Sequence, residues 1–160
     1  MWGFQNPSRI DGSKMKKAKL IIICATQRCG STMIVDDFRC TGVLGNPEEY
    51  FIPWEGQSII EPEEEFKKII QRASPSNEVA TIKVMANQLE HIERNLANAS
   101  RAKSKNVDDI FPHCKELFEA ALFIRVEWLD IVSQAISRHV AYSTGKYHHV
   151  DNSSDFIPGN

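Results

Sequence analysis

The chain has 160 residues, of which 42% are hydrophobic and 25% charged, a composition typical of one soluble domain with a hydrophobic core. Its formal net charge of −2 excludes the overall positive charge with which proteins bind nucleic acid or anionic membranes, so an anion site has to be built locally. No apolar run reaches the roughly 18–20 residues that span a bilayer, and the sequence shows no secretory signal.

The first predicted element is a strand at residues 20–25. Its sequence, Leu-Ile-Ile-Ile-Cys-Ala, is a continuous apolar run, which indicates a strand buried on both faces. Such strands usually lie at the centre of a parallel sheet, so we expect that position here.

A helix is predicted to begin at Ser31, directly after a polar turn. Gly42 is the predicted end of this helix. One side of this helix is expected to carry Met33, Ile34, Phe38 and Thr41, and both Met33 and Met85 are assigned to the core.

The middle of the chain alternates between helix and strand. Residues 46–62 contain Pro47, Pro53, Gly56 and Pro62 and are predicted to be irregular. The elements expected after them are an amphipathic helix at 63–72, a strand at 79–85, a helix at 88–97 and a surface connection at 99–108.

The last part repeats the pattern. A helix with an irregularity at Pro112 is predicted at 107–119, a short strand at 121–126 and a helix at 131–145. This order predicts an α/β domain with a P-loop-like, three-layer architecture, in which helices flank a central, mainly parallel sheet. We expect a single domain over residues 1–160, with its core at about 19–149 and irregular tails at 1–16 and 150–160.

The cysteines form no C-x-x-C pair and no cluster with histidine at metal-ligand spacing. This argues against structural zinc and a disulfide scaffold, and it favours a reducing cytoplasm. His148 and His149 are assigned to a polar tail because no third ligand is placed near them by spacing. The cysteines are Cys24, Cys29, Cys40 and Cys114.

The polar turn after the first strand carries groups that bind oxyanions. Arg28 offers a planar fork of donors, Gly30 allows close approach of the backbone, and Ser31 and Thr32 add hydroxyl groups beside the unpaired N–H groups of a helix start. Phosphate or sulfate is the expected ligand. The turn lacks the Gly and Lys of a Walker sequence, contains no G-x-G-x-x-G, and has no Cys-x5-Arg loop.

Four segments together resemble one family. The sequences "ATQRCGST", "TGVLGNPEEYF", "IKVMANQ" and "DIVSQAIS" occur in the same order as in the bacterial trehalose 2-sulfotransferase family of carbohydrate sulfotransferases. The resemblance covers residues 20–149 in patches, and its first two motifs are the specific ones.

The resemblance implies that the turn binds the 5′-phosphosulfate of 3′-phosphoadenylyl sulfate (PAPS), the sulfuryl donor. In that role Arg28 neutralises charge on the transferring and leaving groups, with loop N–H groups as fixed donors. It also implies direct transfer without a metal or a covalent intermediate, a carbohydrate or glycolipid acceptor, and a homodimer. The implied donor-binding residues are Gln27, Arg28, Cys29, Gly30, Ser31, Thr32 and Ser137.

Two further residues receive roles from the resemblance. Glu49 matches the proposed general base that takes the proton of the acceptor hydroxyl, while Glu48 is expected to be a solvated neighbour. Ser137 occupies the position used for the 3′-phosphate of the donor.

The sequence also departs from the family. Cys29 stands where Ser is usual, and the Arg expected before Asp130 is replaced by the segment Glu127-Trp128-Leu129. Arg125 and Arg138 are candidate substitutes. Family members typically continue well past the position of His149, so a truncated or divergent member is expected.

Two functions therefore stay open. One is a PAPS-dependent sulfotransferase with Arg28 and Glu49 as catalytic residues, and the other is a catalytically weak or inactive module that binds nucleotides or anions. Lys83 can contact the acceptor or a phosphate, but a solvated lysine fits the sequence equally well. Trp128 is assigned to packing rather than to stacking on a base.

Overall fold

The structure is a computed structural model that describes residues 20–74, 78–99 and 109–146. Within these residues, three parallel strands form a sheet. The strand order is β2-β1-β3, with β1 at Leu20–Ala25, β2 at Ala80–Met85 and β3 at Leu122–Val126. β1 pairs in parallel with both neighbours, Leu20 opposite Ala80 and Ile21 opposite Leu122. The predicted central position of the first strand is confirmed.

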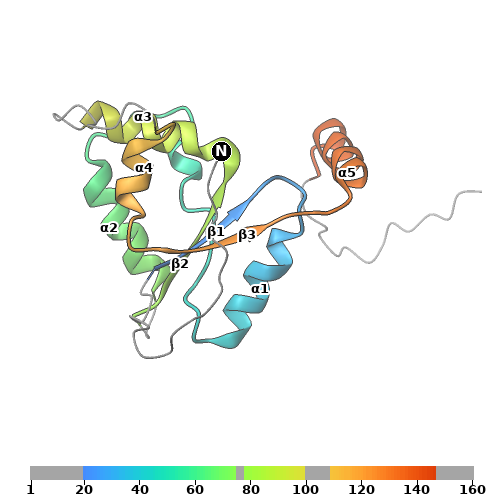
Figure 1. Ribbon diagram of the computed structural model, residues 1–160, viewed down its shortest axis with the longest axis horizontal. Coiled ribbons are helices and arrows are strands. Elements are labelled where there is room, and N and C mark those ends of the chain that lie inside the picture. The colour runs from blue at the N-terminus through green and yellow to red at the C-terminus, as the bar shows by residue number, and fades with distance from the viewer. Residues whose placement is uncertain (1–19, 75–77, 100–108, 147–160) are drawn as a thin grey trace, which may run out of the picture.

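Helices cover the two faces of this sheet (Figure 1). On one face, α1 (Ser31–Thr41) packs through Val35 against Ile23, Met85 and Val126. On the other face lie α2 (Pro62–Ala73), α3 (Leu89–Ala99) and α4 (Pro112–Leu117). The predicted three-layer α/β architecture is therefore confirmed.

The side chains of β1 alternate between the two faces. Ile22 belongs to the core cluster under α2, α3 and α4, whereas Ile23 belongs to the cluster under α1, and both are fully buried. A strand with apolar neighbours on both faces must be apolar at every position, which explains the unbroken run of the sequence.

The prediction that Met33 is a core residue was wrong. Its side chain is 69% exposed, and Thr41 is exposed as well, whereas Met85 is buried as predicted. At 100° per residue, Met33 lies about 160° from Val35, the fully buried apolar residue of α1. The helix therefore turns Val35 to the sheet and Met33 to solvent.

The helix predicted at 107–119 is much shorter in the structure. α4 begins at Pro112 and ends at Leu117. Proline fits the first position of a helix, but it disfavours helical backbone in the residue before it, so the helix cannot start earlier. The predicted tails lie outside the described residues, as does the predicted connection at 99–108 except for Ala99, which ends α3.

Residues 44–49 run along the outer edge of β2. The N–H of Lys83 donates to the carbonyl of Glu48 at 3.0 Å, and the Thr81 hydroxyl donates to the carbonyl of Leu44. Farther along, Phe51 and Trp54 are fully buried, with their rings 5.0 Å apart at an angle of 88°. Because this segment covers the edge, every residue of β2 is buried.

The start of α4 is capped by Glu93 from α3. One carboxylate oxygen accepts hydrogen bonds from the N–H and the Nδ1 of His113, at 3.2 and 2.7 Å, and the other accepts from the N–H of Cys114 at 2.9 Å. Burial by itself raises the pKa of Glu93, but these hydrogen bonds outweigh it and leave the pKa below its ordinary value. The ionised carboxylate therefore stabilises the folded chain.

We expect Glu93→Gln to lower the free energy of unfolding at neutral pH by about 1–3 kcal/mol, because an amide replaces a charged acceptor. The wild-type contribution is complete above the ordinary pKa of 4.5 and is lost as the pH falls through the lower, folded value. Urea unfolding at a series of pH values should thus show the gap between wild type and variant closing in acid. Glu90→Gln, at an exposed position of the same helix, is the control. A gap that stays constant with pH would contradict the assignment.

Candidate functional site

The loop between β1 and α1 has an unusual backbone. Arg28 has φ 64° and Gly30 has φ 81°, both in the left-handed region. For a residue with a side chain this conformation costs about 1–2 kcal/mol, so the surroundings of Arg28 must hold it in place. Strain of this kind is concentrated at ligand-binding loops.

The side chain of Arg28 reaches the last helix, α5 (Ile131–Thr144). Its Nε donates a hydrogen bond to Ser137 Oγ at 2.9 Å, across 109 residues of sequence. Two residues assigned separately from the sequence, one to the transferred group and one to the 3′-phosphate, are thus brought together.

Gln134 is a second link between α5 and the loop, and the sequence analysis missed it. Its Nε2 donates to Thr26 Oγ1 at 2.9 Å and to the carbonyl of Gln27 at 2.8 Å. Gln134 lies three residues before Ser137, so both belong to the same side of the helix. That spacing within "DIVSQAIS" was the signal that could have pointed to it.

Asp130 fixes where α5 begins. Its carboxylate accepts from the N–H groups of Val132 and Ser133 at 3.1 and 3.0 Å and from the Ser133 hydroxyl at 2.6 Å. The bond from that hydroxyl contributes most to a pKa of Asp130 below its ordinary value. Asp130 therefore acts as an N-cap that orients the helix carrying Gln134 and Ser137.

The start of α1 adds uncapped backbone N–H groups to the loop, where they can bind a ligand. Gly30 is the N-cap, no side chain caps the helix, and its first turn holds no acidic residue. The N–H groups of a helix start together with the helix dipole attract an anion. Ser31 is buried and Thr32 is exposed, so the Thr32 hydroxyl is the more accessible of the two.

Cys29 turns its side chain into the protein. It is buried in the cluster under α1 with Ile23, Val35 and Met85. Only the backbone of Cys29 is therefore available to a ligand.

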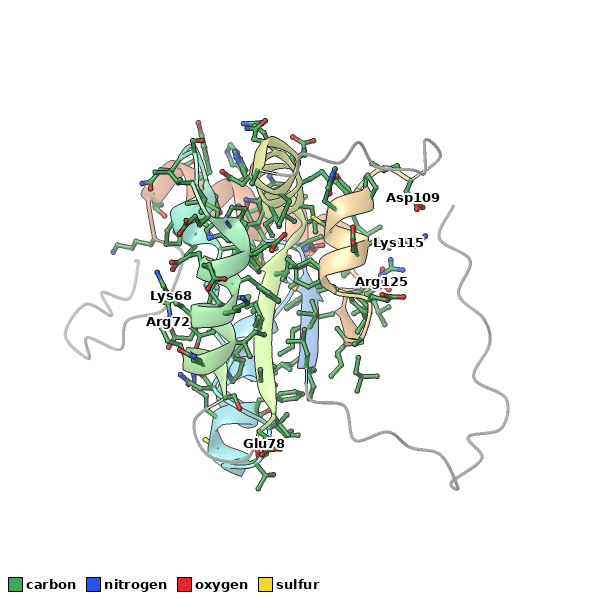
Figure 2. The ribbon with its side chains drawn as sticks, turned by 90° about the vertical axis from the view of Figure 1, so that its left-hand side faces the viewer. Lys68, Arg72, Glu78, Asp109, Lys115 and Arg125 are labelled. Atoms are coloured by element: carbon green, nitrogen blue, oxygen red, sulfur yellow. The ribbon has the colours of Figure 1, made fainter. Side chains whose placement is uncertain are left out.

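Arg138 and Arg125, the two candidate substitutes for the absent arginine, lie in different surroundings. Arg138 lines a cavity of about 720 Å³ together with Thr26, Gln27 and Gln134. Arg125 forms an ion pair with Glu127 and lines a separate cavity. Figure 2 shows Arg125 on the side of the molecule that also carries Lys115 and Asp109. Both cavities include Thr26 and Gln134, but of the two arginines only Arg138 shares its cavity with Gln27 as well.

Trp128, which the sequence analysis assigned to packing, is only partly buried. Its side chain is 46% exposed, and it lines a cavity of about 580 Å³ at the carboxyl ends of β1 and β3. The ring edge lies 3.9 Å from the position that a Cβ on Gly30 would take. Trp128 therefore packs over the loop and leaves part of its ring accessible.

Glu49 lies beside β2, in the segment that covers the edge of that strand. Its Oε1 forms an ion pair with Lys83 Nζ at 2.8 Å. Lys83 is only 6% exposed, so the solvated position considered for it was wrong. Glu48 is exposed and pairs with Arg39 at 3.3 Å, as expected of a surface neighbour.

The described residues contain neither a cluster of metal-ligating side chains nor a helix suited to spanning a membrane. No group of three or more His, Cys, Asp or Glu side chains in this part of the chain could hold a metal ion. Over the same ranges, no helix has both the length and the apolar character that crossing a membrane requires.

Fold and loop together define a class, the three-layer α/β proteins in which a glycine-containing turn joins the central strand to the start of the next helix, an arrangement suited to an anion. Within that class, the sequence model of the Stf0 sulphotransferase family matches residues 20–155. The chain therefore belongs to the Stf0 sulphotransferase family, and the predicted family resemblance is confirmed. No curated protein matches the sequence.

Proposed function

We propose that the protein transfers a sulfuryl group from PAPS to a hydroxyl group of a carbohydrate or glycolipid. Membership of a sulphotransferase family supports a transferase. The observation that carries the proposal of PAPS as donor is the hydrogen bond between Arg28 and Ser137. This bond joins the loop, to which the family resemblance assigns the phosphosulfate, to the helix, to which it assigns the 3′-phosphate.

In this proposal the donor lies across the carboxyl end of β1. The N–H groups at the start of α1 and the guanidinium of Arg28 bind the phosphosulfate, and Thr32 adds a hydroxyl donor. Gln27, Cys29, Gly30 and Ser31 shape the backbone around it. Ser137 binds the 3′-phosphate, and Arg138 supplies the positive charge from the adjoining cavity.

The transfer itself is a direct displacement. The oxygen of the acceptor hydroxyl attacks sulfur, an O–S bond forms, and the bond from sulfur to the bridging phosphate oxygen breaks. The electron pair stays on that oxygen, and adenosine 3′,5′-bisphosphate leaves. Arg28 stabilises the charge that develops there, while Glu49 takes the proton of the hydroxyl.

A second function is an anion- or nucleotide-binding module with little or no transfer activity. The observation that favours it is the segment Glu127-Trp128-Leu129, which stands where an arginine is expected, and the pairing of nearby Arg125 with Glu127. A module of this kind keeps the loop, but a 3′-phosphate on the nucleotide adds little to its binding affinity.

Titration with adenosine 3′,5′-bisphosphate and with AMP separates the two functions. We expect the bisphosphate to bind about 10- to 150-fold more tightly, the equivalent of one or two hydrogen bonds to a charged group. Ser137→Ala should reduce this preference, whereas Ser143→Ala, at an exposed position of the same helix, should not. Equal, weak binding of both nucleotides would support the module.

A further inference from the structure

Lys83 is a charged side chain in the middle of the buried strand β2. Among the described residues it is the one charged residue that is buried. Lysine is rarely buried without a partner, because removing the ammonium group from water carries a large free-energy cost. A lysine at this position therefore needs its partner, Glu49, at 2.8 Å.

The pair is held by the backbone as well as by charge. The N–H of Lys83 donates to the carbonyl of Glu48. Lys83 therefore binds both the side chain of Glu49 and the backbone of the residue before it. From the other direction, Arg39 of α1 donates to the carbonyl of Pro47 at 2.7 Å. Residues 47–49 are thus fixed from two elements, which limits the orientations that the Glu49 side chain can take.

The carboxylate of Glu49 is only partly used by this pair. The ammonium group contacts Oε1, and no hydrogen bond reaches Oε2 from any residue in the described part of the chain. The Glu49 side chain is 27% exposed, so solvent and ligands have access to it. One oxygen is therefore held and the other is available to accept a proton.

We propose that Lys83 is the positioning residue for Glu49, an inference that rests on the proposed sulfuryl transfer. Lys83 binds one oxygen of the carboxylate and thereby directs the second oxygen toward the acceptor hydroxyl. Lys83 itself contacts neither the sulfur nor the phosphate. Its contribution lies in the geometry of proton removal, a step in which an error of about 1 Å can cost about 100-fold in rate.

The test is Lys83→Met, which keeps most of the side-chain length and removes the charge. With PAPS and an accepting sugar, we expect kcat to fall about 10- to 100-fold, while the dissociation constant of adenosine 3′,5′-bisphosphate stays the same. The matched control is Lys68→Met, which breaks an exposed pair with Glu65 on the outer side of α2 and should leave kcat unchanged (Figure 2).

Two further variants separate positioning from a general loss of structure. Lys83→Arg keeps a positive donor and should recover part of kcat. In the background of Glu49→Gln, adding Lys83→Met should lower kcat no further, because the carboxylate that Lys83 positions is already gone. If Lys83→Met lowers kcat by the same factor in the wild type and in the Glu49→Gln background, the proposal is overturned.

The outcomes also separate this inference from the proposed function. If the wild-type chain transfers no sulfuryl group to any of a panel of sugars and glycolipids, the proposed function fails and the inference with it. If the wild type transfers and Lys83→Met transfers at the same kcat, only the role of Lys83 is overturned. A folded state for each variant is checked by thermal unfolding.

Discussion

We expect Glu49→Gln to lower kcat for the proposed sulfuryl transfer by about 10²–10⁴-fold, the usual contribution of a general base. Glutamine has nearly the same size as glutamate, but its amide cannot take the proton of the attacking hydroxyl. Because Glu49 lies beside β2 and not in the anion loop, we expect the affinity for adenosine 3′,5′-bisphosphate to stay the same. Transfer of labelled sulfate under saturating donor and acceptor measures this effect.

Glu48→Gln is the matched control for that experiment. Glu48 is the adjacent carboxylate, is exposed and pairs with Arg39 rather than with Lys83. Its replacement should change kcat less than twofold, since exposed ion pairs contribute only about 0–1 kcal/mol. Similar kcat values for wild type and Glu49→Gln would remove Glu49 as the base.

We expect Gly45→Ala to destabilise the folded chain by about 2–5 kcal/mol. Gly45 has φ +80°, and an added Cβ would lie 2.6 Å from the carbonyl oxygen of Val79 and 2.8 Å from that of Ala73. Val79 directly precedes β2 and Ala73 ends α2, so both oxygens belong to the backbone and cannot rotate away. The segment along β2 would have to shift, and it carries Glu49.

Gly42→Ala separates the two causes of this loss. Gly42 also has a positive φ, +67°, but nothing lies within 4 Å of an added Cβ. Its replacement should therefore cost only the conformational part, about 1–2 kcal/mol. Urea unfolding of both variants measures the difference, and equal losses would show that the contact along β2 is unimportant.

The candidate site was predictable from the sequence to an uneven degree. Residues 27–32 could be proposed as an anion loop because a strand, a turn with Gly and a helix start are contiguous, so local chemistry is enough for this prediction. Gln134 was missed because its partners, Thr26 and Gln27, are more than a hundred residues away in sequence. The hydrogen bond from Arg28 to Ser137 could not be predicted, because these residues are also more than a hundred positions apart in sequence. The family resemblance assigned a role to each residue but no contact between them.

The elements show the same division between local and long-range causes. The three strands and the helices after them were predicted within a few residues, because apolar runs and helical spacing are properties of short segments. Met33 was misplaced because one apolar residue can stand on either side of a short helix. Which side faces the sheet depends on the whole set of contacts, and Val35 occupies the buried side.

By itself the sequence determined the α/β pattern and the central strand, and it predicts the anion loop, since each follows from residues that are neighbours along the chain. Only the tertiary structure decided that Lys83 is buried and paired with Glu49. Alternation along a strand tells which face a side chain takes, but not whether another segment covers the strand's edge. Residues 44–49 cover that edge because Gly45 can approach the backbone of β2 closely, and this packing brings Glu49 to Lys83.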